Sequence, residues 1–186
     1  MSVFTSRTQK VKIRNVISTA DLRQDVEITR LNEYAWGRYD IENNYNGKVG
    51  YAKDKSMTGR VTVFSTGKMI STGAKSIAKS TEQLQKTMAL LATGEFIKPV
   101  QLVPVIRNIV GTMDVKNQID IKNLALLVPK IIYEPDQFPG AIFRTSEGPV
   151  CLIFSTGKVV MVGSKSEKQA FDCANNIANI LEKFWV

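Results

Sequence analysis

An internal repeat constrains the fold of this chain more than any other feature. The pentapeptide Phe-Ser-Thr-Gly-Lys occurs at Phe64–Lys68 and again at Phe154–Lys158, an offset of 90 residues. Upstream the offset is 93, because Arg14-Asn15 matches Arg107-Asn108. Ordered agreement of this kind indicates a duplicated unit. We therefore divide the 186 residues into an N-terminal arm (1–10), a first repeat (11–96) and a second repeat (97–186).

Each repeat predicts an α+β unit built on one antiparallel sheet. In the first copy a short helix is expected over 25–34, and two strands are expected over 59–65 and 69–72. A longer amphipathic helix follows, with Ser76 as its candidate N-cap and Ser166 as the matching residue of the second copy. We expect the two units to join their sheets and to bury the helices against one face.

Composition excludes several classes of function. Without histidine the chain has no Ser-His-Asp or Cys-His catalysis and no histidine-ligated zinc, and Cys151 and Cys173 alone cannot build a four-cysteine site. No phosphate loop or dinucleotide fingerprint is present, so we expect neither an enzyme nor a cofactor or metal. No apolar run approaches the ~18 residues of a membrane span. The first residues lack a signal-peptide pattern, which predicts an intracellular protein.

The charge balance points to an acidic partner. The net charge is +8, which suits nucleic acid, anionic lipid or an acidic protein. Four lysines lie at matched places beside the predicted strands: Lys68, Lys75, Lys158 and Lys165. An apolar sheet surface rimmed by cations suits a DNA minor groove between its phosphate walls.

The second face of the sheet allows two interpretations. Along the strand after Gly59, Val61 and Val63 point to one side, while Thr62 and Phe64 point to the other. One interpretation is a sheet buried on both faces. The other is a largely apolar face that remains open to solvent and binds a ligand.

The repeated motifs resemble those of the TATA-box-binding protein family. The resemblance rests on the paired Arg-Asn strands, the paired Phe-Ser-Thr-Gly-Lys hairpins and the segment Tyr133–Gly140, and it covers about 11–185. It implies a pseudo-twofold saddle, with one continuous curved antiparallel sheet and helices on the convex face. It also implies a general transcription initiation factor that binds and kinks the minor groove of A·T-rich (TATA-like) double-stranded promoter DNA. Such factors recruit transcription factor B and, through it, RNA polymerase.

The resemblance also assigns roles to individual residues. The aromatic side chains implied to insert between base steps are Tyr45, Phe64, Phe138 and Phe154. The residues implied to contact the minor groove are Asn15, Ile17, Thr62, Thr72, Asn108, Val110, Leu152 and Val162. Phosphate contacts fall on Lys68, Lys75, Arg144, Lys158 and Lys165, and transcription factor B contacts fall on Glu134 and Asp136.

The chemistry of the two asparagines agrees with the implied role. An A·T minor groove offers only acceptors, to which a short amide can donate, while G·C pairs add an amino group. The apolar side chains Ile17, Val110 and Leu152 offer no partner to that amino group. A preference for A·T follows from these contacts.

The first repeat departs from the family pattern at several positions. It has Tyr45 where the family has phenylalanine, Thr62 where an apolar residue is usual, and Tyr51 at the offset position of Arg144. In the second repeat Val162 stands where threonine is common. These departures keep two alternatives open: a divergent paralogue with altered promoter preference, and a saddle-shaped protein-interaction module that has lost DNA bending.

Two further expectations accompany the resemblance. The short arm is more similar to archaeal members, so we expect the archaeal cytoplasm or nucleoid, with a eukaryotic nucleus as the alternative. Pairing of two copies in the absence of DNA is left open, and no membrane partner is expected.

Overall fold

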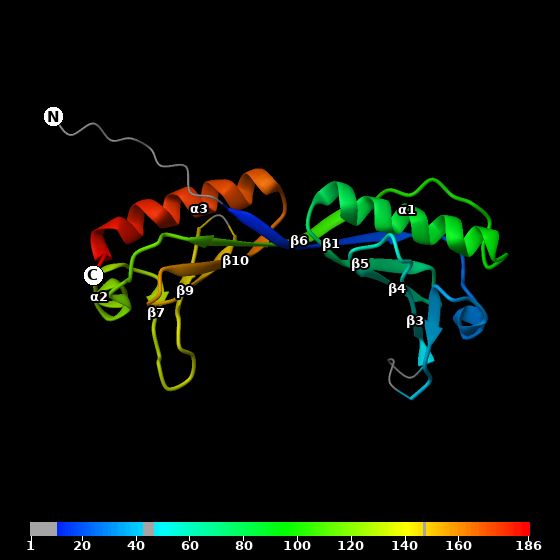
Figure 1. The fold of residues 1–186 in the computed structure, drawn as a ribbon, viewed down its shortest axis with the longest axis horizontal. Helices are drawn as coiled ribbons and strands as arrows, with labels where there is room; N and C mark the ends of the chain where they lie inside the picture. The colour runs from blue at the N-terminus through cyan, green and yellow to red at the C-terminus, as the bar shows by residue number, and fades with distance from the viewer. Residues whose placement is uncertain (1–10, 43–46, 147) are drawn as a thin grey trace. The chain divides into compact units, whose positions relative to one another are not determined.

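The computed structural model describes residues 11–42, 47–146 and 148–186 (Figure 1). The predicted arm (1–10) and Tyr45 lie outside the described residues. The chain forms two compact units. The N-terminal unit is Arg14–Asn108, and the C-terminal unit is Ile109–Val186 together with 11–13 of the described residues.

The N-terminal unit is an antiparallel sheet with one long helix. Its strands follow the hydrogen-bonded order β2-β3-β4-β5-β1. Its elements are β1 (Lys12–Asp21, whose first residues belong to the other unit), the 3₁₀ helix η1 (Ile28–Glu33), β2 (Gly37–Tyr39), β3 (Val49–Ala52), β4 (Arg60–Phe64), β5 (Lys68–Ala74) and α1 (Ile77–Thr93).

The C-terminal unit has the same plan, with strand order β6-β10-β9-β8-β7. Its elements are β6 (Val105–Asp114, whose residues to Asn108 belong to the N-terminal unit), α2 (Ile121–Leu127), β7 (Ile131–Ile132), β8 (Ala141–Arg144), β9 (Val150–Ile153), β10 (Lys158–Ser164), α3 (Glu167–Leu181) and η3 (Glu182–Phe184). Both units are therefore α+β, which confirms the predicted class. Among the described residues no helix combines the length and the apolar character needed to cross a membrane.

The predicted caps of the two long helices are confirmed. The Ser76 side chain accepts a hydrogen bond from the Lys79 N–H, and the Ser166 side chain accepts one from the Gln169 N–H. The short helix of the first copy is shorter than predicted. The Val26 N–H donates to the Ser65 carbonyl, and Glu27 has φ of −76° and ψ of +73°, outside the helical region, so regular structure begins only at Ile28.

The repeated Thr-Gly turns have a common structural cause. Gly67 and Gly157 have φ of +80° and +82°, a left-handed conformation that side chains other than glycine adopt at a cost. A Cβ on Gly67 would lie 2.1 Å from the Gln24 carbonyl oxygen, and one on Gly157 would lie 2.2 Å from that of Asn117. Glycine is required in both turns because the chain that follows β1 or β6 packs directly against them.

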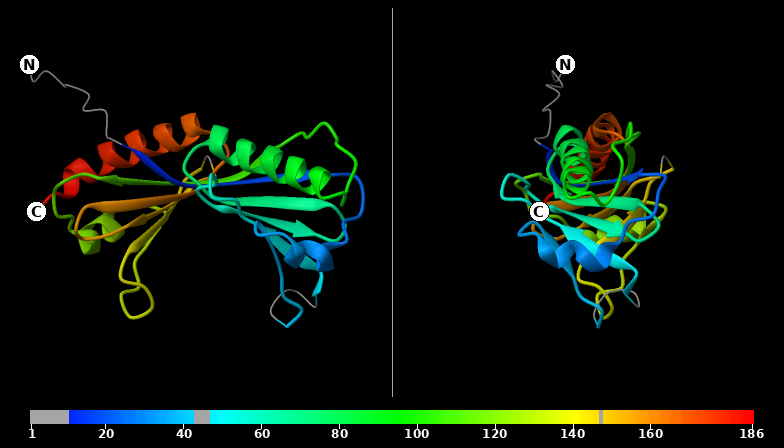
Figure 2. Two further views of the ribbon diagram at one scale, coloured as in Figure 1. Left: turned by 45° about the vertical axis from the view of Figure 1, so that its right-hand side comes forward. Right: turned by 90° about the vertical axis from the view of Figure 1, so that its right-hand side faces the viewer.

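Each sheet buries one face and leaves the other open. In Figure 1 α1 lies along one face of the N-terminal sheet and α3 along one face of the C-terminal sheet. In β4, Val61 and Val63 are fully buried, while Thr62 and Phe64 are only half-buried. In the C-terminal unit Ile153 is fully buried and Phe154 is half-buried. The interpretation of a sheet buried on both faces is therefore wrong, and we call the half-buried side of each sheet its open face (Figure 2).

The two cores differ in chemistry beneath their long helices. In the N-terminal unit a buried hydrogen-bond network joins α1 to β1 and β5 through Ser18, Ser71, Ser80 and Gln83. The Gln83 side chain donates to the Ser71 hydroxyl at 2.8 Å and accepts from the Gly59 N–H at 2.8 Å. The matched positions of the C-terminal unit are Gly111, Met161, Ala170 and Cys173. These residues pack as an apolar core instead.

Both cysteines are buried thiols of the C-terminal core. The sulfur atoms of Cys151 and Cys173 lie 3.3 Å apart, which is hydrogen-bond contact and longer than a disulfide bond. The hydrogen bond to Cys173, reinforced by burial, raises the pKa of Cys151. The thiol therefore remains protonated and acts as a packing residue.

Candidate nucleic-acid interface

Two aromatic rings stand together at the open face of the C-terminal unit. Phe138 and Phe154 meet edge to face, with ring centroids 5.8 Å apart and an interplanar angle of 61°. A Cβ on Gly140 would lie 2.9 Å from the Phe138 ring and 3.2 Å from the Phe154 ring. The glycine therefore leaves space for both rings, which remain half-buried although apolar. Two of the predicted wedge residues are thus brought together.

Cross-strand registers define one row of open-face residues in each unit. In the C-terminal unit the row runs Ile132, Ile142, Leu152, Val160 and Thr112. In the N-terminal unit the matching row runs Arg38, Tyr51, Thr62, Ile70 and Thr19. The C-terminal row is almost wholly apolar, while the N-terminal row is polar at most positions. The departure noted at Thr62 therefore extends along a whole row.

Asn15 is held by the backbone of β5. Its side-chain oxygen accepts a hydrogen bond from the Gly73 N–H at 2.8 Å. Gly73 has φ of +84° at an irregularity in the pairing of β1 with β5, which turns its N–H toward Asn15. With the oxygen engaged, the amide NH₂ group is the part of Asn15 that can donate to a ligand.

The predicted minor-groove residues lie on the open faces. In the N-terminal unit the side chains that are neither buried nor fully exposed include Asn15, Ile17, Thr62, Thr72 and Asn108. In the C-terminal unit the same holds for Val110, Leu152 and Val162.

Strand register corrects one equivalence that the sequence offset suggests. The offset matches Tyr51 with Arg144, but Tyr51 pairs with Thr62 and Arg144 pairs with Val150. Tyr51 thus corresponds in the sheet to Ile142. The Tyr51 ring supports another cation instead, since the guanidinium carbon of Arg60 lies 4.4 Å from the ring centroid.

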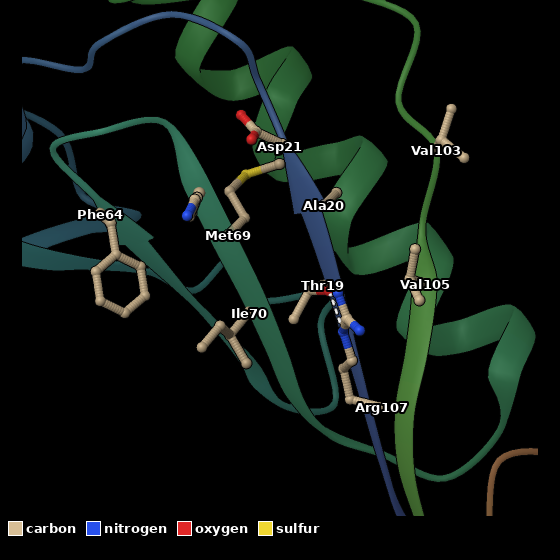
Figure 3. A pocket seen from close by; sticks show the side chains of 10 residues that line it. Thr19, Ala20, Asp21, Phe64, Met69, Ile70, Val103, Val105 and Arg107 are labelled. Atoms are coloured by element: carbon tan, nitrogen blue, oxygen red, sulfur yellow. Dashed lines mark hydrogen bonds between the residues drawn. The ribbon is translucent and has the colours of Figure 1, made fainter.

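Phe64 borders a pocket in the N-terminal unit (Figure 3). Ile70 and Val105 contribute apolar walls, and Lys68 and Arg107 contribute cations. The Arg107 side chain donates to the Thr19 hydroxyl at 2.9 Å, and this hydrogen bond holds the guanidinium against β1. Phe64 is therefore accessible from the open face beside two positive charges.

The predicted phosphate-binding residues are exposed in both units. Lys68 and Lys158 stand at the starts of β5 and β10, opposite Asp21 and Asp114. The backbone N–H of Lys116 and then its side-chain ammonium group donate to Asp114 and keep the pKa of that carboxyl below its usual value, with a smaller contribution from the Lys158 charge. The remaining members are also exposed: Lys75, Lys165 and Arg144.

The acidic loop between β7 and β8 is accessible. Glu134 and Asp136 are both exposed, and within the described part of the chain neither takes part in an ion pair. The Glu134 carbonyl accepts hydrogen bonds from the Gln137 and Phe138 N–H groups. This turn connects the acidic loop to the Phe138 ring.

Sequence reasoning missed three residues of the open faces. Ile132 and Ile142 extend the apolar row to the edge of the C-terminal sheet, and Arg60 adds a cation to the N-terminal face. The alternation of exposed and buried residues along β4 could have placed Arg60 beside Thr62 and Phe64. Nothing in the sequence indicates that its guanidinium stacks on Tyr51.

Comparisons with known proteins agree with this architecture. The family described as "Transcription factor TFIID (or TATA-binding protein, TBP)" matches residues 10–93 and 103–184. A TATA-box-binding protein of Cenarchaeum symbiosum is 36% identical over 172 residues, covering 90% of this chain and 94% of the relative. One of Thermococcus kodakarensis is 30% identical over 178 residues, covering 94% and 92%.

A solved structure shares the fold. Methanococcus jannaschii TBP superposes with a TM-score of 0.80 at 26% identity, covering 94% of this chain and 99% of that chain. The matching family is one of transcription factors and not of enzymes, and its two-repeat α+β fold is the fold of this chain. The chain belongs to the TATA-box-binding protein family. The predicted resemblance and the family's two-repeat fold are confirmed, and as a transcription factor the chain acts inside the cell.

Proposed function

We propose that this chain is a general transcription initiation factor that binds A·T-rich promoter DNA in the minor groove. The observation that carries the proposal is the open, largely apolar sheet face bearing the Phe138–Phe154 pair and bordered by exposed cations. Apolar side chains fit the groove floor, the rings insert between base steps as in other members of this family, and the cations neutralise phosphates. The archaeal relatives favour an archaeal cytoplasm or nucleoid as the place of action.

A bending assay tests this proposal directly. End-labelled duplexes with and without a TATA-like element would be titrated with the chain at two salt concentrations, and the end-to-end distance would be followed by fluorescence transfer. We expect a shorter distance only with the A·T-rich element, and weaker binding at higher salt. Binding without bending, or no binding, would favour the protein-interaction module and contradict the proposal.

Asn15→Asp provides a test of base contact. The substituted carboxylate keeps an acceptor for the Gly73 N–H but loses the NH₂ donor and adds a negative charge. We expect about tenfold weaker binding to A·T-rich DNA, from the value of a good base contact. Asn175→Asp on exposed α3 adds the same charge away from the open face and controls for it. Equal affinities of the two variants for A·T-rich DNA would show that Asn15 makes no base contact.

We also propose that the acidic loop recruits transcription factor B. Glu134→Lys reverses an exposed charge and is expected to leave DNA bending intact while weakening the ternary complex about tenfold. Native gels with DNA and transcription factor B would measure this. Glu182→Lys in η3 is a control with the same charge change. If the ternary complex forms normally with Glu134→Lys, the loop does not serve this partner.

A second candidate is a divergent paralogue with unequal halves. The polar N-terminal row, in contrast to the apolar C-terminal row, favours it. Thr62 can accept from a guanine amino group, so we expect Thr62→Leu to increase the discrimination of A·T over G·C about threefold in the half-site it contacts. Competition binding with singly substituted duplexes would measure the ratio. An unchanged ratio of A·T to G·C affinity would show that Thr62 does not contribute to base discrimination.

A further inference from the structure

Arg60 lies on the open face of the N-terminal unit. It alternates along β4 with the buried Val61 and shares its side of the strand with Thr62. Across the sheet Arg60 pairs with Thr72, whose hydroxyl lies 3.5 Å from the Arg60 carbonyl. An exposed guanidinium therefore stands beside two residues of the proposed minor-groove contact.

The Tyr51 ring orients this guanidinium. The guanidinium carbon lies 4.4 Å from the ring centroid, within the range of a cation–π contact. This contact restricts the position of the guanidinium, whose planar fork of N–H donors matches a phosphate. The ion pairs formed by the described residues do not include Arg60.

The C-terminal unit has an arginine in a comparable place, Arg144, but on β8 and not on β9, the counterpart of β4. There Val150 occupies the position of Arg60 and Val162 that of Thr72, while Arg144 pairs with Val150 from β8. In the N-terminal unit the same register puts the exposed Lys53 at the place of Arg144, Arg60 on β4 adds a second cation, and Tyr51 on β3 supplies an aromatic ring in the adjacent row. Both units thus place one arginine near the same corner of the open face.

We propose that Arg60, held by Tyr51, binds a phosphodiester of the DNA backbone in the N-terminal half-site. This inference rests on the proposed function. It assigns to Arg60 the contact that the sequence offset would place on Tyr51. Tyr51 acts as a positioning residue and makes no phosphate contact itself.

Salt dependence tests the contact. In Arg60→Ala the slope of log affinity against log salt is expected to fall in magnitude by about 1, as for the loss of one phosphate contact. The affinity for A·T-rich and G·C-substituted duplexes is expected to fall by the same factor. Lys55→Ala, which removes a charge from an exposed turn, should leave the slope unchanged. An unchanged slope for Arg60→Ala, or a loss confined to the A·T-rich duplex, would overturn the proposal.

Two variants of Tyr51 test the positioning role. Tyr51→Phe keeps the ring and is expected to keep the wild-type slope, while Tyr51→Leu is expected to lose about half of the Arg60 effect on affinity. Equal behaviour of the two variants would overturn the stacking. Wild-type bending and its loss in Phe154→Ala serve as the reference. If the wild-type chain fails to bind DNA, the proposed function fails. If the wild-type chain binds and bends DNA and Arg60→Ala has the same affinity and salt slope, only this inference fails.

Discussion

Replacing Phe154 with alanine is expected to weaken binding to A·T-rich DNA by about 2–3 kcal/mol and to reduce the bend. The estimate follows from the cost of partly unstacking a base step, for which minor-groove wedges of the TATA-box-binding protein family are an established example. The ring stands half-buried against Phe138 and is accessible for the proposed insertion. Phe138→Ala should have a similar effect because the two rings form one unit.

Fluorescence transfer and equilibrium binding would measure this effect, with circular dichroism as the check on folding. Phe171 is the matched control, because it is an exposed phenylalanine on α3 rather than on the open face. Phe171→Ala should retain wild-type affinity and bend. A loss below about 1 kcal/mol for Phe154→Ala would argue against a wedge, given the unstacking energies involved.

Replacing Gly157 with alanine is expected to lower the free energy of unfolding by about 3 kcal/mol. A left-handed residue other than glycine costs roughly 1–2 kcal/mol, and the new Cβ adds a backbone clash. That Cβ would lie 2.2 Å from the Asn117 carbonyl oxygen, which cannot move without displacing the chain after β6. Chemical denaturation followed by circular dichroism would measure the change.

Gly148→Ala separates the two contributions. Gly148 also has positive φ, +107°, but the nearest atom to its Cβ would be Gln169 Nε2 at 3.9 Å. This variant carries conformational strain without the clash and should cost only about 1–2 kcal/mol. If the two variants lose the same stability, the packing of Asn117 against the turn contributes nothing.

The repeat predicts most of what is local in the chain. Ser76 and Ser166 cap the long helices as expected, and Gly67 and Gly157 form the turns. These features depend on a few neighbouring residues, so their sequence signals are direct. The helix before Tyr34 is shorter than its sequence pattern predicts, because Glu27 has ψ of +73°, outside the helical region, while Val26 is tied to the distant Ser65.

Features that depend on strand register could not be predicted. A shift in register changes which residues face each other, and the offset gives no sign that Tyr51 lies opposite Thr62. The contact of Arg60 with Tyr51 follows from that register, and the anchoring of Asn15 by Gly73 follows from the irregular pairing of β1 with β5. The candidate site is therefore predictable as a set of residues, while the orientation of its polar groups requires the structure.

The buried network of Ser18, Ser71, Ser80 and Gln83 has a consequence for the ancestry of the two halves. At the matched positions of the C-terminal unit, Met161 and Ala170 fill space with apolar atoms, and Cys173 contacts only the thiol of Cys151 among the hydrogen bonds described above. A helix taken from one half and grafted onto the other would bury a glutamine without partners or leave a void beside unpaired serines. The long helices of the two copies are therefore no longer interchangeable, because each requires core partners that the sheet of the other copy does not provide. Exchanging them would require changes in the helix and in the sheet together.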